Sequence, residues 1–384
     1  MGLSMLQRKP DSGLGNIRSS PADPSRNIDW VLLTAQLALT VAGCFIVFSA
    51  TRTRTADPYT FVTRQVIFAI AATVVMFVVM AIDYEWLKQH ARTLYVLTIV
   101  TLFVLALYSL AAAGTILAFE LGPIQVQPAE FAKFTVLLAL CSYLSEERSD
   151  EVSYPRFLGG LMIVGLPVVL IVAQPDLGSA TVLIAMAMGV LLVAGAKARY
   201  ILTISLLSVV TLGAAFIGRL VNPYQLARVR VFFDENNPDL EKEVYQVTNA
   251  VRAVGTGGIF GKGWLQGPLT NGRDIPVIWA DFPFAAVGEQ FGLVGCAAIL
   301  TLFAVLLVRV WRIAHLSRDL LGTYLCAGVF TMLLWQVFQN IGMTIKIMPV
   351  TGLPMPFISY GGSSLITWFA LLGVVQSVHM RRMR

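Results

Sequence analysis

Long apolar runs recur along most of the chain and are separated by short polar connections. A helix needs about 20 mostly apolar residues to cross about 30 Å of bilayer hydrocarbon. The pattern therefore predicts an all-α polytopic membrane protein with about ten transmembrane helices. The predicted spans lie near residues 30–50, 65–83, 93–117, 130–145, 157–173, 179–196, 200–218, 291–311, 320–345 and 362–380.

The composition agrees with a membrane location. Hydrophobic residues make up 57% of the chain and charged residues 13%, whereas an ordinary soluble domain carries about 25% charged residues. This deficit excludes a soluble enzyme, a disordered protein and a nucleic-acid binder. The cysteines lie in apolar stretches without metal-ligand spacing, which is typical of packing residues; they are Cys44, Cys141, Cys296 and Cys326.

The basic residues between the spans predict an orientation. An even number of spans places both termini on one side, and twelve Lys and Arg residues fall on that side against five in the short connections opposite. Because basic residues concentrate in cytoplasmic connections, both termini are expected in the cytoplasm. Residues 1–28 are then a cytoplasmic N-terminal tail and not a signal peptide, and residues 29–384 form one membrane domain.

The connection 219–290, between the seventh and eighth spans, is too polar to cross a membrane and is expected on the outer side. Long connections of this kind are usually functional or disordered. Within it, residues 239–254 place apolar side chains at helical spacing, with Asp239 as N-cap and Gly255 as the C-terminal stop. This pattern predicts an amphipathic helix on the membrane surface or on the protein's own outer face.

No histidine is expected on the outer side, because the predicted topology places His90, His315 and His379 on the cytoplasmic side. A zinc cluster or a histidine-activated nucleophile is therefore not expected there, and acid–base chemistry would need a carboxylate. Asp281 stands out because apolar residues surround it in IPVIWADFPFAAVGEQFG, and partial burial would raise its pKa. The alternative, that Asp281 only caps a helix starting at Pro283, stays open.

A second set of charges lies at the outer ends of the predicted spans, namely Arg64, Glu130, Lys133, Asp176 and Lys346. Ionisable residues at membrane depth are costly and suggest function. One interpretation is that Arg64, Lys133 and Lys346 hold a phosphate-bearing lipid headgroup. The other is structural ion pairing, of Glu130 with Lys133 or of Arg64 with Asp176.

Two glycine-rich segments flank these charges. TGGIFGKG (256–263) lacks the first Gly and the final Ser or Thr of a phosphate-binding loop, so a flexible loop is expected. PVTGLPMPFISYGGSS (349–364) is rich in Pro and Gly and includes Ser363, a predicted substrate-binding residue. Such an irregular segment is tolerated at membrane depth only where protein buries it or where it lines a cavity.

These segments together resemble the SEDS family (shape, elongation, division and sporulation), which includes RodA and FtsW. The resemblance extends from about residue 30 to the C-terminus, and its PVTG form is more similar to RodA. Its motifs are QPAEFAK (127–133), QPDLGSA (174–180), GTGGIFGKG (255–263), the ADF of 280–282 with GEQFG (288–292), and NIGM (340–343) with PVTGLPMPFISYGGSS.

The resemblance implies a peptidoglycan glycosyltransferase that polymerises lipid II at the outer face of a bacterial plasma membrane. It implies that Asp281 is catalytic, that Arg64, Glu130, Lys133 and Asp176 belong to the site, and that a class B penicillin-binding protein is a partner. The hypothesis is an inverting transfer in which Asp281 accepts the proton of the acceptor's 4-hydroxyl. Cations, with a possible divalent ion (Mg²⁺ or Mn²⁺), would stabilise the leaving undecaprenyl pyrophosphate.

Two departures from the family pattern and two alternative functions accompany this hypothesis. An Arg-Trp pair usually precedes the QPAEFAK motif, where this chain reads GTILAFELGPIQV, and polar neighbours of Asp281 are lost. The alternatives are a lipid II flippase and a non-catalytic scaffold for a penicillin-binding protein. A flippase would need charges at several depths, and the inner halves of the predicted spans contain few.

Overall fold

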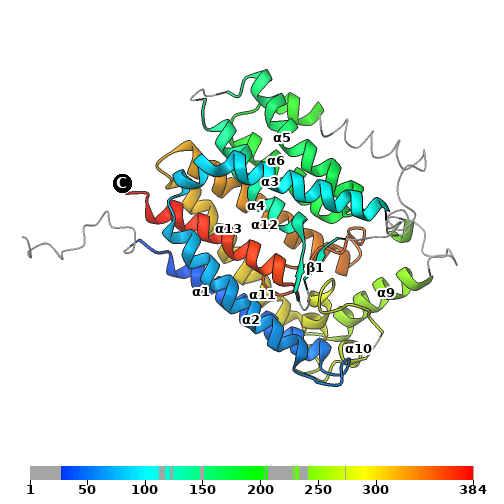
Figure 1. The fold of residues 1–384 in the computed structure, drawn as a ribbon. Helices are drawn as coiled ribbons and strands as arrows, with labels where there is room; N and C mark the ends of the chain where they lie inside the picture. Colours follow the sequence, from blue (N-terminus) through cyan, green and yellow to red (C-terminus); the bar gives the residue numbers. More distant parts are fainter. Residues whose placement is uncertain are drawn as a thin grey trace, which may run out of the picture.

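In the residues that the structure describes, the protein is a bundle of long helices with a small hairpin (Figure 1). The computed structural model describes residues 27–111, 117–121, 124–147, 151–203, 205, 228, 230–232, 241–272 and 274–383. Their helices and strands are α1 (Trp30–Thr51), α2 (Thr60–Ala81), α3 (Tyr84–Ala111), β1 (Phe119–Leu121), β2 (Ile124–Val126), α4 (Pro128–Leu144), α5 (Tyr154–Ala173), α6 (Leu177–Val193), α9 (Glu241–Thr256), α10 (Pro268–Asn271), α11 (Pro283–His315), α12 (Leu320–Thr344) and α13 (Gly362–Met380).

The expected all-α membrane architecture is confirmed. In the described part of the chain, seven helices are long and apolar enough to cross a membrane, and the apolar α6 is shorter, with 17 residues. The predicted seventh span, 200–218, lies mostly outside the described residues, as does the predicted tail up to residue 26. The protein is therefore a multi-pass membrane protein.

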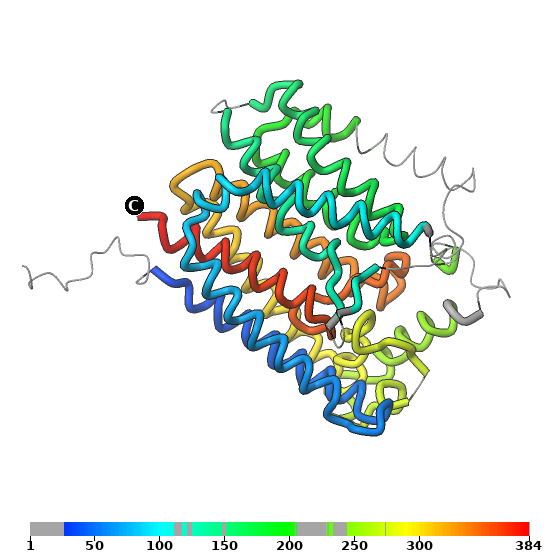
Figure 2. Tube along the Cα trace, in the orientation of Figure 1, coloured from blue at the N-terminus to red at the C-terminus, as the bar shows by residue number. Residues whose placement is uncertain are grey.

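Helix α13 forms the centre of the bundle (Figure 2). It packs along α2 and also contacts α4 and α12. Nearly all of its residues are buried, as expected of a helix that is surrounded by others. The C-terminus and the start of α1 lie at one end of the bundle, here called the terminus end, and the hairpin, α9 and α10 lie at the other, the pocket end (Figure 1).

Two predicted spans begin too late. Helix α3 starts at Tyr84 instead of residue 93, because its first two turns include charged residues that a hydropathy pattern excludes. Helix α11 starts at Pro283 instead of residue 291 and bends at Gly292, whose φ is +63°. Asp281 is not the cap of this helix, since the N-cap is Phe282.

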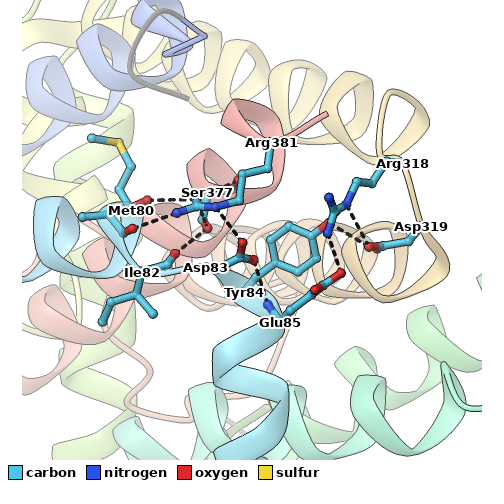
Figure 3. Close-up of polar contacts among 10 residues, drawn as sticks. Met80, Ile82, Asp83, Tyr84, Glu85, Arg318, Asp319, Ser377 and Arg381 are labelled. Carbon is cyan, nitrogen blue, oxygen red and sulfur yellow. Dashed lines mark hydrogen bonds and ion pairs between the residues drawn. The ribbon is translucent and has the colours of Figure 1, made fainter. Parts of the chain in front are cut away.

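Polar contacts fasten the terminus end (Figure 3). Arg381 donates to the carbonyl of Ala81 at 2.7 Å and to the Ser377 hydroxyl at 2.6 Å, which connects α13 to the end of α2. The Tyr84 hydroxyl donates to Asp319 at 2.8 Å and accepts from Arg318 at 3.0 Å. These bonds fix the turns between α2 and α3 and between α11 and α12, where helix ends leave backbone groups unsatisfied.

The segment 345–361 enters the bundle from the pocket end without regular structure. Its side chains Leu353, Met355, Phe357 and Ile358 are at most 2% exposed. The ring of Phe357 lies 6.5 Å from that of Phe303, in the middle of α11. The irregular backbone is thus buried in protein, as its Pro and Gly content predicts.

Gly43 of α1 allows this re-entrant segment to approach. A Cβ atom at Gly43 would lie 2.5 Å from the Phe357 carbonyl oxygen. We expect Gly43→Ala to lower the free energy of unfolding by about 1–3 kcal/mol, measured by unfolding in detergent. Gly165→Ala in α5 is the matched control, since nothing lies within 4 Å of its added Cβ; equal stability of the two variants would contradict the close contact.

Candidate active site

A polar pocket of about 610 Å³ opens at the pocket end of the bundle. Its walls come from α2, the hairpin, the 277–281 segment, the end of the re-entrant segment and the start of α13. Its charged lining residues are Arg64, Glu120 and Asp281. The other lining residues include Phe61, Gln125, Gln127, Trp279, Gly352, Tyr360 and Ser363.

Asp281 is held in the pocket wall through its backbone. The buried Asn340 side chain of α12 donates to the Asp281 carbonyl at 2.9 Å and to the Leu353 carbonyl at 2.8 Å. One residue earlier, the Ser359 hydroxyl donates to the Ala280 carbonyl at 2.6 Å. The backbone of Asp281 is thus held by α12 and the re-entrant segment, while the residue remains partly exposed and lines the pocket.

The environment of Asp281 suits a general base. Burial raises the pKa of its carboxyl above the ordinary value, and the positive charge of Arg228 opposes that rise. A raised pKa strengthens a carboxylate as a proton acceptor, provided that it remains ionised at the working pH. Asp281 is the kind of perturbed carboxyl that is common in active sites.

Arg64, on α2, lines the same pocket and is exposed. Within the described part of the chain it forms no ion pair, so the predicted pairing with Asp176 is not found. The next residue, Gln65, is fully buried and donates to the Ser359 carbonyl at 3.2 Å. Helix α2 thus supports the Asp281 wall through Gln65 and presents a cation to the pocket through Arg64.

Ser363 fastens the hairpin to α13. Its hydroxyl donates to the Gln125 carbonyl at 2.8 Å and accepts from the Gln127 backbone N–H at 3.2 Å. The strands pair antiparallel with Glu120 opposite Gln125, and both residues line the pocket. This hairpin occupies the stretch in which the family's Arg-Trp pair is absent, and it places the carboxylate of Glu120 there.

Glu130 and Lys133 lie behind the pocket wall. Their side chains are almost completely buried and form an ion pair at 2.7 Å. Lys133 also donates to Gln336 at 3.2 Å, and Gln336 donates to the Pro354 carbonyl at 2.7 Å. Because Pro354 lines the pocket, the pair supports the wall from behind. This geometry matches the alternative in which Glu130 and Lys133 form a structural ion pair.

The two remaining predicted residues also lie outside the pocket lining. Asp176 caps α6 by accepting from the Ser179 N–H at 2.9 Å, and it accepts from Gln127 at 3.2 Å. Lys346 follows the end of α12, is partly buried and has a φ of +63°. The structure therefore places Arg64, Ser363 and Asp281 in the pocket lining, and Glu130, Lys133, Asp176 and Lys346 outside it.

The segment 255–263 is not the flexible loop that its glycines predict. Lys262 N–H donates to the Glu289 carbonyl at 2.9 Å and Leu293 N–H to the Gly258 carbonyl at 2.9 Å, so the segment packs on the bend of α11. The fully buried Glu289 carboxylate accepts from Lys262 and from the Thr270 N–H. It organises the loop. Helix α9 packs on α11 and α12 and continues to Thr256, so Gly255 does not stop the helix as expected.

Asn340, Ser359 and Gln65 support the pocket wall, a role that the sequence alone does not assign to them. Asn340 and Ser359 fall in the NIGM and PFISYGG motifs, so the signal existed, but a motif does not say which backbone a side chain reaches. No cluster of three His, Cys, Asp or Glu side chains suited to a metal occurs among the residues that the structure describes.

The fold and site define a polytopic helical membrane protein whose polar pocket is lined by the carboxylate of Asp281 and by Arg64. The family model of the FtsW, RodA and SpoVE cell cycle proteins matches residues 29–384. Stage V sporulation protein E of Bacillus subtilis is 32% identical over 365 residues, with 91% of this chain and 96% of that protein covered. Peptidoglycan glycosyltransferase MrdB of Escherichia coli K12 is 32% identical over 360 residues, covering 93% and 94%.

Solved structures agree with these relatives. RodA of Thermus thermophilus matches with a TM-score of 0.66 at 26% identity, covering 93% of this chain and 98% of that one. A chain of a peptidoglycan synthase complex that coordinates polymerization and crosslinking matches with a TM-score of 0.75 at 27% identity, covering 93% and 99%. The chain belongs to the FtsW, RodA and SpoVE family, which is the SEDS family that its motifs indicate.

Proposed function

We propose that this protein is a peptidoglycan glycosyltransferase that polymerises lipid II by inverting transfer, with Asp281 as the general base. The observation that carries the proposal is the position of Asp281 in the wall of a polar pocket at one end of a membrane-spanning bundle. Relatives that share about a third of its sequence carry the name of this activity.

Two residues of the pocket lining divide the reaction between them. The Asp281 carboxylate accepts the proton of the acceptor sugar's 4-hydroxyl as that oxygen forms its bond to the donor's anomeric carbon. The bond from that carbon to the pyrophosphate oxygen breaks, and its electron pair leaves with the undecaprenyl pyrophosphate. Arg64, which lines the same pocket, stabilises the growing negative charge.

The packing of the bundle favours a polymerase over a flippase. A second polar cavity, of about 790 Å³, lies at the terminus end beside Glu85 and Arg318. Between the two cavities α4 and α12 pack closely, since a Cβ at Gly328 would lie 2.1 Å from a methyl carbon of Leu137. A headgroup moving between the cavities would have to separate these helices.

The direct test uses lipid II in proteoliposomes that contain the purified protein, and it measures two products. A glycosyltransferase gives glycan polymer that is resolved by gel electrophoresis and cut by muramidase, whereas a flippase moves labelled lipid II between leaflets without polymer. Absence of polymer with the protein alone and with a class B penicillin-binding protein would contradict the proposal.

We also propose an orientation of the protein in the membrane, a protein partner and a divalent cation. The pocket end faces outward and both termini lie in the cytoplasm, as the distribution of basic residues indicates. A class B penicillin-binding protein is the proposed partner, in keeping with the synthase complex that resembles this chain. A divalent cation such as Mg²⁺ or Mn²⁺ would be held mainly by the oxygens of the substrate's pyrophosphate.

We expect Arg64→Gln to lower kcat/KM for lipid II polymerisation about tenfold, because one charge-assisted hydrogen bond to the leaving group is lost. Arg64→Lys keeps the charge and should recover part of the rate. Arg252→Gln, an exposed position on α9 outside the pocket lining, is the control. Equal rates for Arg64→Gln and Arg252→Gln would remove Arg64 from the site.

A further inference from the structure

Arg228 belongs to a short helical piece, residues 228 and 230–232, within the long connection before α9. The piece is anchored by Val231, which is 3% exposed and packs with Val247 of α9. Val244 of α9 and Val350 of the re-entrant segment complete this small apolar cluster. Arg228 is therefore held against the PVTG stretch, which continues into the pocket wall.

The guanidinium of Arg228 covers Gly352. One of its terminal nitrogens lies 2.9 Å from the position that a Cβ on Gly352 would occupy. Gly352 lines the pocket together with Asp281 and has a φ of +70°. Any side chain there would displace the guanidinium, so the bare glycine lets a cation approach the Asp281 wall.

Arg228 differs from the other charged residues near Asp281 in its effect on the Asp281 carboxyl. Besides Asp281, the ionisable residues that line the pocket are Arg64, Glu120 and Tyr360. Among the charged groups near Asp281, the positive charge of Arg228 opposes the rise in the pKa of Asp281 that burial causes. A cation near a buried carboxyl favours its ionised form.

We propose that Arg228 is a positioning residue for the general base: from its place over Gly352 it keeps the Asp281 carboxylate ionised and ready to accept the acceptor's proton. The inference rests on the proposed function of Asp281. It assigns Arg228 no contact with the leaving group, which is the role of Arg64. A residue of the connection between the predicted seventh and eighth spans thereby contributes to the catalytic site.

The direction in which pH affects the activity follows from the role of Asp281 as a general base. A base acts only when deprotonated, so activity rises with pH through its pKa and falls on the acidic side. Without Arg228 the pKa of Asp281 rises further, because burial is no longer opposed. The acidic limb of the activity profile then moves to higher pH, while the rate at alkaline pH changes little.

The experiment measures lipid II polymerisation by the full-length Arg228→Gln protein in proteoliposomes, from about pH 5 to pH 9. We expect a loss of about tenfold or more at the acidic end and of about threefold or less at the alkaline end. Arg228→Lys, which keeps the charge, should show the same acidic limb of the pH–activity profile as the wild type. Arg230→Gln, an exposed neighbour on the same piece, is the matched control and should leave the profile unchanged.

A uniform loss across the pH range, or an unshifted profile, would overturn the inference. Arg228→Lys guards against misfolding, since a purely structural need for the guanidinium would lower its rate at every pH. Asp281→Asn, measured in parallel, separates the two proposals. Full activity of that variant would contradict the base itself, whereas an inactive Asp281→Asn with an unshifted Arg228→Gln would contradict only the role of Arg228.

Discussion

Lys133→Met is expected to lower the free energy of unfolding by about 3–5 kcal/mol, because it leaves the buried Glu130 carboxylate without its cation. Both side chains are at most 1% exposed, and their ion pair spans 2.7 Å. The substitution also removes the hydrogen bond to Gln336, which supports the Pro354 carbonyl in the pocket wall. The loss of stability should therefore come with a loss of activity.

The double variant Glu130→Gln with Lys133→Met distinguishes structure from substrate binding. Neutralising both partners removes the uncompensated charge, so most of the lost stability should return. Unfolding in detergent, followed for the wild type, both single variants and the double variant, gives the coupling energy of the pair. A stable Lys133→Met protein with impaired lipid II binding would instead assign Lys133 to the substrate.

The membrane architecture could be read from the sequence because burial in lipid imposes long apolar runs. The ends of helices were less predictable. Helix α3 extends beyond its apolar part through Glu85 and Lys88, whose charges hydropathy treats as connection. The bend of α11 at Gly292 depends on the packing of segment 255–263 against it, and that contact is remote in sequence.

The pocket was partly predictable for a related reason. Asp281 stood out as a carboxyl among apolar neighbours, and Arg64 as a cation at the end of a span. The local sequence does not distinguish Asp281 and Arg64 from Lys133 as pocket residues. The Lys133 side chain becomes fully buried only when α4 packs against α12. The bond from Asn340 to the Asp281 carbonyl joins residues 59 positions apart, so composition and periodicity contain no trace of it.

Asp281→Asn should reduce the rate of polymerisation by about 10²–10⁴-fold, the usual value of general-base assistance. The amide has nearly the shape of the carboxylate but cannot accept the hydroxyl proton. The backbone contacts of the residue, from Asn340 to its carbonyl and from its own N–H to Val277, do not involve the side chain. The variant should therefore fold normally and still bind lipid II.

The most direct measurement of the central claim is the initial rate of glycan polymer formation from lipid II by Asp281→Asn. Asp274→Asn provides the control, since Asp274 lies in the same segment but outside the pocket lining, where it accepts from Tyr245. The account predicts a rate at least about a hundredfold below wild type for Asp281→Asn and near wild type for Asp274→Asn. A well-folded Asp281→Asn protein that polymerises at the wild-type rate would contradict it.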